Sequence, residues 1–491
     1  MAGKEVTLPS AWVSIVPLLV LIAMVALTIT LFGSDALDGG NQVSLFVAAG
    51  VCVCISMWMY KTPWKIFEDS ITKTIGQASV SIVILMVIGM MSGSWMISGV
   101  VPTLIYYGIQ IMSPQFFLVS TCVICAIVSV VTGSSWTTVA TIGVALLGIG
   151  EALSIPSSWT AGAIISGAYF GDKISPLSDT TILASSASGT DLFRHIRYML
   201  YTTTPSISVT LILFFMAGFW YGGESSHAVD YTKGLTKTFN ISFITLVVPI
   251  ITALLIARKV PSLITLFVSS LTAGICALIL QPNILLQVAN EEVASPLPLI
   301  KGLMMTWYGP TAIDTGQNNL NELISTGGMA GMMGTIWLIL CAMCFGGVMT
   351  ASRMLESITN VIIKGIRGTF SMVTSTVATG LIMNLSTCDQ YISIIVSASM
   401  FKDVYKKRGY APELLSRTTE DSATVTSVLI PWSTCGMTQA TVLGVPTLVY
   451  MPYCFFNYIS PLMSCFIAAI GWKIRCIKQS EVNSELEITN N

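Results

Sequence analysis

Long apolar stretches separated by short polar segments follow one another along the whole chain. We predict membrane-spanning helices at residues 11–32, 41–60, 80–100, 199–222, 241–257, 262–280, 332–352 and 446–471. Each is close to the ~20 apolar residues that a bilayer requires. The first stretch lacks a cleavage site of small residues, so we interpret it as a retained span rather than a secretory signal. The pattern predicts an all-α polytopic membrane protein.

Four further apolar segments are shorter or interrupted. Two pairs of short apolar runs are joined by Thr132-Gly-Ser-Ser135 and by Asn384-Leu-Ser-Thr387, and we expect re-entrant hairpins at 115–150 and 371–401. Residues 159–190 and 411–440 contain acids, hydroxyls and a proline, which predicts a broken helix in each. Non-helical backbone is tolerated at membrane depth only where it is buried in protein or lines a watery cavity. These interruptions therefore predict a cavity.

Lysine and arginine positions predict how the chain is threaded through the membrane. With the N-terminus in the cytoplasm, 19 of the 23 lie on the cytoplasmic side, at 4, 61–73, 194–197, 258–259, 353–367, 402–417 and 473–478. Only Lys233, Lys237 and Lys301 lie outside, while Lys173 lies within a broken helix. Positive charge is enriched in cytoplasmic loops of membrane proteins. We therefore predict a multi-pass protein of the bacterial inner (plasma) membrane with both termini in the cytoplasm.

The interrupted segments recur along the chain. The two hairpin turns are offset by 252 residues, as are Ser175-Pro-Leu177 and Ser427-Val-Leu429. The charge rule gives the two halves opposite orientation, although chance similarity of the motifs is an alternative. We predict two inverted-topology repeats, each with about five spans and one hairpin. The predicted parts are a first repeat at 1–222, an external connector at 223–240, a second repeat at 241–472 and a cytoplasmic tail at 473–491.

Composition excludes several functions. The 491 residues are 53 % hydrophobic and 10 % charged, with a net charge of −1, so the chain has no basic surface for nucleic acid. Only two histidines are present and the 12 cysteines lie almost entirely in apolar stretches, so we predict no transition-metal site. The chain has no phosphate-binding loop and no serine-nucleophile elbow. We expect a transporter without a cofactor rather than an enzyme.

Acids within the interrupted segments are the candidate chemistry. A charged side chain at membrane depth costs ~2.5–3.5 kcal/mol on insertion scales, so these acids are functional candidates. We expect one cation site and a pseudo-symmetric partner, with Asp389 as a further ligand and Lys173 as a possible counter-charge. The first site comprises Asp172, Asp179, Ser134, Ser135, Ser175 and Thr180, and the second comprises Asp421, Ser386, Thr387 and Ser427. The alternatives are structural ion pairs, of Asp172 with Lys173 or Arg194 and of Asp421 with Arg417.

Several of these segments together resemble one known family. The segments are Gly167-Ala-Tyr-Phe-Gly-Asp-Lys-Ile-Ser-Pro-Leu-Ser-Asp-Thr-Thr181, Glu420-Asp-Ser-Ala-Thr-Val-Thr-Ser427, Ile430-Pro-Trp-Ser-Thr-Cys-Gly436 and Gly444-Val-Pro446. They resemble the NhaC family of sodium/proton antiporters, and the resemblance covers about residues 10 to 472. Val428 departs from the proline that we expect in the second Ser-Pro-Leu of that family.

The resemblance implies exchange of external protons for internal sodium by a fold with two re-entrant hairpins in inverted repeats. Similar proteins exchange malate and protons for sodium and lactate, so an organic-acid or amino-acid exchanger of the same fold is the alternative. A channel and an intramembrane aspartyl protease are rivals from other classes. Tyr169 replaces the first glycine of the G-x-G-D signature that such a protease requires.

One carboxylate can serve both ions. Burial favours the protonated carboxyl while an adjacent sodium ion favours the ionised form, so sodium and a proton exclude one another. We expect the hairpins and broken helices to move against the remaining spans in alternating access. The expected partners are sodium ions, protons and the lipid bilayer, with a homodimer as a possible assembly.

Overall fold

The computed structural model describes residues 8–32, 39–221, 228–293, 295–311, 313–316, 320–321 and 324–477. Within these ranges every regular element is a helix, apart from isolated bridges between Thr311 and Thr326 and between Tyr410 and Cys476. Eight of the described helices are long and apolar enough to cross a membrane, or up to ten if each of two bent pairs is one span. These helices confirm the predicted all-α class with several membrane-spanning segments.

The helices follow one another as follows. The first half contains α1 (Ala11–Phe32), α2 (Gly40–Met59), α3 (Trp64–Ile97), α4 (Val100–Ile111), α5 (Pro114–Thr132), α6 (Ser135–Thr138), η2 (Val139–Gly143), α7 (Val144–Ala152), α8 (Ser157–Ile174), α9 (Asp179–Ser188) and α10 (Leu192–Tyr221). Between the halves lie α11 (Ala228–Thr238), η3 (Phe243–Leu246), α12 (Val247–Ala257), α13 (Ser262–Leu280), α14 (Pro282–Ala289), α15 (Pro296–Tyr308) and α17 (Gly328–Gly331). The remainder is α18 (Met333–Ala351), α19 (Met354–Lys364), α20 (Thr369–Thr387), α21 (Gln390–Lys407), α22 (Pro412–Thr419), η4 (Glu420–Thr424), η5 (Ser427–Leu429), α23 (Thr434–Leu443), α24 (Thr447–Tyr450), η6 (Met451–Tyr453) and α25 (Phe455–Ile470).

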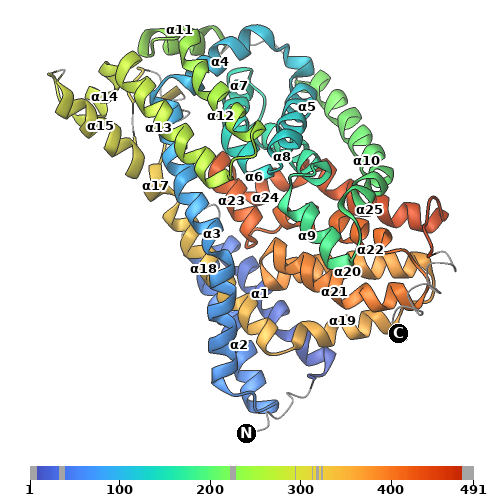
Figure 1. Ribbon diagram of the computed structural model, residues 1–491. Coiled ribbons are helices and arrows are strands. Elements are labelled where there is room, and N and C mark those ends of the chain that lie inside the picture. Colours follow the sequence, from blue (N-terminus) through green and yellow to red (C-terminus); the bar gives the residue numbers. More distant parts are fainter. Residues whose placement is uncertain are drawn as a thin grey trace.

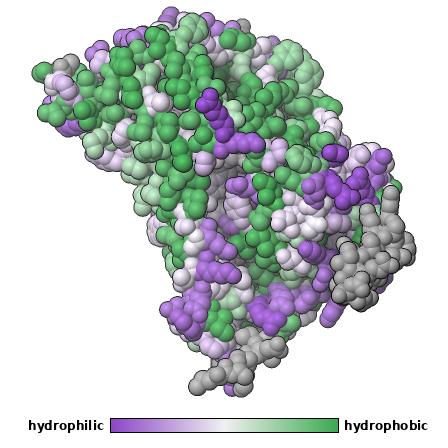
Figure 2. Space-filling view, in the orientation of Figure 1, coloured by the Kyte–Doolittle hydropathy of each residue, from purple (hydrophilic) through white to green (hydrophobic). Residues whose placement is uncertain are grey.

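Two groups of helices flank the interrupted segments. The long helix α3 packs along α18 and α13 on one side, while α5, α8, α10 and α25 pack against one another on the other (Figure 1). Apolar side chains cover much of the visible face, and polar ones gather toward its lower and right edges (Figure 2). Trp12, Trp58 and Trp220 are 86 %, 87 % and 88 % exposed. Such apolar surface is expected where a protein faces lipid rather than water.

Most predicted spans coincide with helices. Two of them are bent: Phe243–Ala257 follows Tyr231–Thr238 at 90°, and Phe455–Ile470 follows Thr447–Tyr453 at 55°. The span predicted at 80–100 is the second part of α3, which begins at Trp64. The pattern missed α4, α14, α15 and α19, because each is shorter than a full span. Residues 222–227 of the predicted connector and 478–491 of the predicted tail lie outside the described residues.

A tight turn interrupts each segment that we predict to be a hairpin. Gly133 ends α5 with φ 66°, and the Ser134 side chain caps α6 by accepting a hydrogen bond from the Thr137 amide at 3.2 Å. Cys388 ends α20 with φ 58°, and the Asp389 carboxylate caps α21 by accepting from the Ile392 amide at 3.0 Å. We refer to Gly133–Ser134 as the first turn and to Cys388–Asp389 as the second turn. A left-handed residue followed by a capping oxygen explains both reversals.

The two broken helices are interrupted at prolines. Four extended or turn residues, Ser175–Ser178, separate α8 from α9, and four more, Ile430–Ser433, separate η5 from α23. We call these the first break and the second break. Each contains a proline, Pro176 or Pro431, preceded by an extended residue. Proline has no amide hydrogen and disfavours helical geometry in the residue before it, so it fixes the position of each break.

These elements recur at a constant distance. Helix α20 begins and ends 255 residues after α5, and α23 begins and ends 255 residues after α9. The counterpart of Pro176 is therefore Pro431, not Val428. The offset of 252 predicted from the sequence is wrong by three residues, because it aligned Ser175-Pro-Leu177 with residues that are still helical, Ser427–Leu429.

Candidate functional site

The first turn lies directly against the first break. A Cβ atom on Gly133 would come within 2.7 Å of the Leu177 backbone, so only glycine permits this approach. Across the same contact, the Ser135 amide donates a hydrogen bond of 3.1 Å to the Asp172 carboxylate near the end of α8. The turn and the break thus hold a buried acid between them, since Asp172 is only 6 % exposed.

A cavity of about 420 Å³ opens at this contact. It is lined by Val80, Ser81, Ile84, Thr132, Gly133, Ser134, Ser135, Trp136, Thr137, Asp172, Leu177, Ser178, Asp179, Thr180, Ile256, Lys259, Val260, Pro261, Ser262, Leu263, Thr265, Gln390 and Tyr391. We call it the aspartate cavity. Five residues predicted for the first cation site line it: Asp172, Asp179, Ser134, Ser135 and Thr180.

The aspartate cavity offers oxygen atoms for a hard cation. Asp172 is buried in its wall and Asp179 is exposed at the start of α9. Carboxylate, hydroxyl and backbone oxygens are the ligands that hard cations prefer. Gln390 and Tyr391 of α21 add polar groups that the sequence analysis did not assign, and exposed Lys259 stands at the rim. Their position directly after Asp389 was the available signal for these two residues.

Ser175 has a different place from the rest of its predicted group. Its hydroxyl donates to the Val130 carbonyl at 2.8 Å and accepts from the Leu177 amide at 3.2 Å. These bonds hold the first break against α5. Ser175 is buried and does not line the aspartate cavity.

The second turn reproduces the hydrogen bonds of the first. Thr132 contacts Thr138 at 3.2 Å across the first turn, and Thr387 contacts Ser393 at 2.9 Å across the second. Below the turns, Ser129 donates to the Ala168 carbonyl at 2.6 Å and Asn384 donates to the Ala423 carbonyl at 2.7 Å. All of these residues correspond at the 255-residue offset.

The acid changes place between the two halves. Asp389 of the second turn corresponds to Ser134 of the first turn, whereas Asp172 and Asp179 correspond to Ser427 and Thr434. Asp389 is 6 % exposed and accepts a bond of 3.4 Å from the Thr434 hydroxyl. The second turn therefore carries its acid on the turn itself, while the first half carries its acids beside the break.

The other residues predicted for the second site are separated. Ser386 donates to the Ile382 carbonyl at 2.6 Å and Ser427 to the Thr424 carbonyl at 2.8 Å. Asp421 instead accepts bonds from Lys173, from Thr202 at 3.2 Å and from Ser460 at 3.1 Å, which belong to α8, α10 and α25. The printed hydrogen bonds therefore link Asp421 to three other helices and not to Ser386, Thr387 or Ser427.

Lys173 and Asp421 form a fully buried ion pair. The Lys173 ammonium also donates to Ser460 at 2.8 Å. Arg417 lies 4.0 Å from the other Asp421 oxygen, which gives the arginine of the alternative pairing a real contact. The sequence analysis raised Lys173 as a counter-charge but did not identify its partner, which is 248 residues away.

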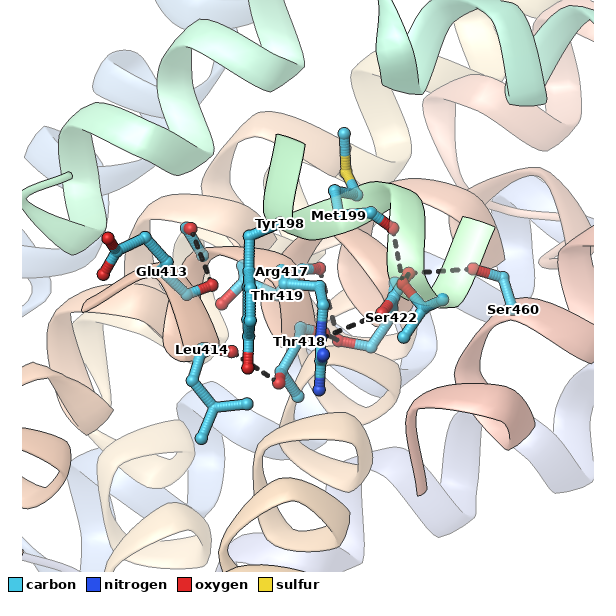
Figure 3. Close-up of polar contacts among 12 residues, drawn as sticks. Tyr198, Met199, Glu413, Leu414, Arg417, Thr418, Thr419, Ser422 and Ser460 are labelled. Carbon is cyan, nitrogen blue, oxygen red and sulfur yellow. Dashed lines mark hydrogen bonds and ion pairs between the residues drawn. The ribbon is translucent and has the colours of Figure 1, made fainter. Parts of the chain in front are cut away.

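Arg417 is completely buried against an aromatic ring. Its guanidinium carbon lies 4.7 Å from the centre of the Tyr198 ring, and Figure 3 shows the two side chains alongside one another. None of its three guanidinium nitrogens has a hydrogen-bond partner among the described residues. The neighbouring Ser422 and Ser460 complete a polar cluster among otherwise apolar helices (Figure 3).

Comparison with known proteins identifies the relatives of this chain. The model of the Na+/H+ antiporter family matches residues 3–187 and 167–472. A malate-2H(+)/Na(+)-lactate antiporter of Bacillus subtilis is 34 % identical over 485 residues, which cover 98 % of this chain and 99 % of the relative. NhaC Na(+)/H(+) antiporters of Bacillus subtilis and Alkalihalophilus pseudofirmus are 34 % and 36 % identical. These alignments cover 87 % and 83 % of this chain and 92 % and 86 % of the relatives.

The matches extend over both turns, both breaks and the aspartate cavity. They confirm the resemblance found in the sequence motifs, and the apolar helices agree with a multi-pass membrane protein. The chain belongs to the Na+/H+ antiporter family.

Proposed function

We propose that this protein exports sodium in exchange for protons by alternating access. The observation that carries the proposal is the meeting of Asp172 and Asp179 with the hydroxyls of the first turn in one cavity. Sodium requires the ionised carboxylate and a proton neutralises it, so the two ions compete for the same oxygens. Competition at one site makes binding an exchange.

The position of the cavities supports alternating access. The aspartate cavity borders α3 at Val80–Ile84, and a second cavity of about 620 Å³ borders the same helix at Ile88, Ser92 and Met96. A helix rises about 1.5 Å per residue, so the two cavities follow one another along α3. Lys259 at the rim of the aspartate cavity belongs to a positive segment that we assign to the cytoplasm. In this proposal the aspartate cavity is the inward opening.

The recurring turns and breaks support two inverted repeats. Transporters with such repeats bind ions where discontinuous helices meet, and move one group of helices against another. The moving group here comprises α5–α9 and α20–α23. The supporting group includes α3 and α13, which pack together beside the cavity.

Proteoliposomes containing the purified protein test this function. An imposed pH gradient, acidic outside, should drive sodium out of the vesicles carrying right-side-out protein, without any organic solute. Collapse of the gradient by an ionophore should stop that flux. Sodium movement that requires an organic solute, or that ignores the pH gradient, would exclude the proposal.

A second candidate is exchange of an organic acid together with the ions. The aspartate cavity is large enough for a small carboxylic acid beside a sodium ion, and Lys259 supplies a cation at its rim. The malate-2H(+)/Na(+)-lactate relative aligns over nearly the whole chain. Adding malate outside and lactate inside the same vesicles separates the two functions, because only the exchanger accelerates with both acids present.

A further inference from the structure

Four charged residues lie behind the aspartate cavity without counterparts in the repeat. They are Lys173, Arg417, Glu420 and Asp421, all of them 0 % exposed. At the 255-residue offset the corresponding residues are Val428, Gly162, Ile165 and Ser166. The same kind of broken helix therefore forms with uncharged residues at these positions. The charges are not required by the break itself.

Glu420 differs from the other three in its pairing. Lys173 and Asp421 bind one another, and Arg417 approaches Asp421. Among the described residues, no ion pair involves Glu420, and its Oε2 atom has no hydrogen-bond partner. A buried carboxylate without a paired cation is costly, whereas a buried carboxylic acid is tolerated. Glu420 is also the first residue of the π-helical segment η4, a geometry common at functional sites.

A chain of hydroxyl groups connects Glu420 to the aspartate cavity. The Thr180 hydroxyl donates to Glu420 Oε1 at 3.3 Å and contacts the Ser178 hydroxyl at 3.0 Å. Ser178 in turn acts as a hydrogen-bond partner of the Asp172 carboxylate. Asp172, Ser178 and Thr180 all line the cavity, and Glu420 lies one hydroxyl behind its wall.

We propose that Glu420 holds a second transported proton, which reaches it from Asp172 through the hydroxyls of Ser178 and Thr180. This inference rests on the proposed sodium/proton exchange at the cavity. In the transfer, Asp172 gives its proton to Ser178 Oγ, Ser178 gives its own to Thr180 Oγ1, and Thr180 gives its own to Glu420. Each hydroxyl loses one O–H bond and gains another, so only the two carboxyls change charge.

Groups on every neighbouring helix influence this proton. Lys173 favours the ionised Glu420, whereas Asp172 favours the protonated form. The other titratable or hydroxyl-bearing neighbours are Asp179 and Thr180 of α9, Arg417 of α22, Asp421 and Thr424 of η4, Asp389 and Tyr391 beside α21, His195 of α10 and Tyr458 of α25. Helix α20 contains no acidic or basic residue. Sodium in the aspartate cavity adds a positive charge near Glu420, which favours release of the second proton.

Calorimetric titration of the purified, full-length protein with NaCl at a series of pH values tests the inference. The slope of log Kd against pH equals the number of protons that one sodium ion displaces. We expect a slope approaching two for the unmodified protein and no more than one for Glu420→Gln. Glu413→Gln is the matched control, because Glu413 is also buried but contacts Arg194 at 3.3 Å and Arg475 at 3.6 Å. It should retain the slope of the unmodified protein.

The other outcomes overturn the inference. A slope near one for the unmodified protein, or an unchanged slope in Glu420→Gln, shows that Glu420 carries no exchanged proton. Loss of sodium binding in Glu420→Gln places the residue in the sodium site instead. Where Glu420→Gln does not give monodisperse protein, Glu420→Met replaces it, following the apolar Ile165 of the first half. Failure of the underlying exchange is distinguished by Asp172→Asn, which would then bind sodium as well as the unmodified protein does.

Discussion

The ammonium of Lys173 on α8 and the carboxylate of Asp421 on η4 form an ion pair with no exposure to solvent. The pair joins the first broken helix to the second across 248 residues of sequence. Asp421 also accepts hydrogen bonds from α10 and α25, so one carboxylate connects four segments. The two broken helices are therefore fastened together behind the aspartate cavity.

Removing one member of this pair should be severely destabilising. Lys173→Met leaves a buried carboxylate with only the 4.0 Å contact to Arg417, and we expect a loss of roughly 3–5 kcal/mol. Thermal unfolding of the detergent-solubilised protein measures the loss. The double variant Lys173→Met/Asp421→Leu should regain at least half of it, because no unpaired charge remains. A double variant that is less stable than both single variants would contradict this account of the pair.

The contact between the first turn and the first break predicts a specific effect of one methyl group. Gly133→Ala has to adopt φ 66° and also collides with the Leu177 backbone. We expect sodium transport to fall at least tenfold as the turn is pushed away from Asp172. Gly471→Ala is the control, because Gly471 has φ 69° and open space around its Cβ position. It should lose about 1–2 kcal/mol of stability from backbone strain alone and keep its transport rate.

The exchanged position of the acid in the second turn separates capping from charge. Asp389→Ser copies Ser134, so it should keep the helix cap, whereas Asp389→Ala should lose about 1 kcal/mol of stability. If the carboxylate serves ion transport, both variants slow sodium flux to a similar extent. Normal flux in Asp389→Ser would show that this acid acts as a cap and nothing more.

Labelling of single cysteines tests the predicted topology. In a background with the exposed Cys54 and Cys476 replaced by serine, Lys301→Cys should react with an impermeant maleimide applied to intact cells. Lys406→Cys should react only after the membrane is opened, because residues 371–401 turn back instead of crossing. External labelling of Lys406→Cys would mean that α20 and α21 do not form a re-entrant hairpin.

Much of the architecture was predictable because it depends on local chemistry. Length and apolarity locate α1, α2 and α13, while Pro176 and the acids around it locate the first break. The correct repeat offset was missed, since both Ser427-Val-Leu429 and Ile430-Pro-Trp432 resemble the first motif and only the end of the helix decides between them. Proline at 431 was the stronger signal, because its missing amide hydrogen is what ends a helix.

The partners of the buried charges were beyond local reasoning. Lys173 neighbours Asp172 in sequence, but successive residues on a helix point in different directions, and Lys173 reaches Asp421 instead. Glu420 and Thr180 meet only because two broken helices pack face to face. Such contacts depend on tertiary packing between segments more than 200 residues apart, which no spacing rule within one helix describes.

Equilibrium binding of radioactive sodium to the purified protein, with protons as competitors, tests the central role of the aspartate cavity most directly. The unmodified protein should bind sodium more weakly as the pH falls. Asp172→Asn and Asp179→Asn should each bind at least tenfold more weakly at high pH, and the pH dependence should flatten in Asp172→Asn. Asp69→Asn, which removes an exposed acid of α3 that lies outside the cavity, should bind as the unmodified protein does. Unchanged, pH-dependent sodium binding in both cavity variants would contradict the account.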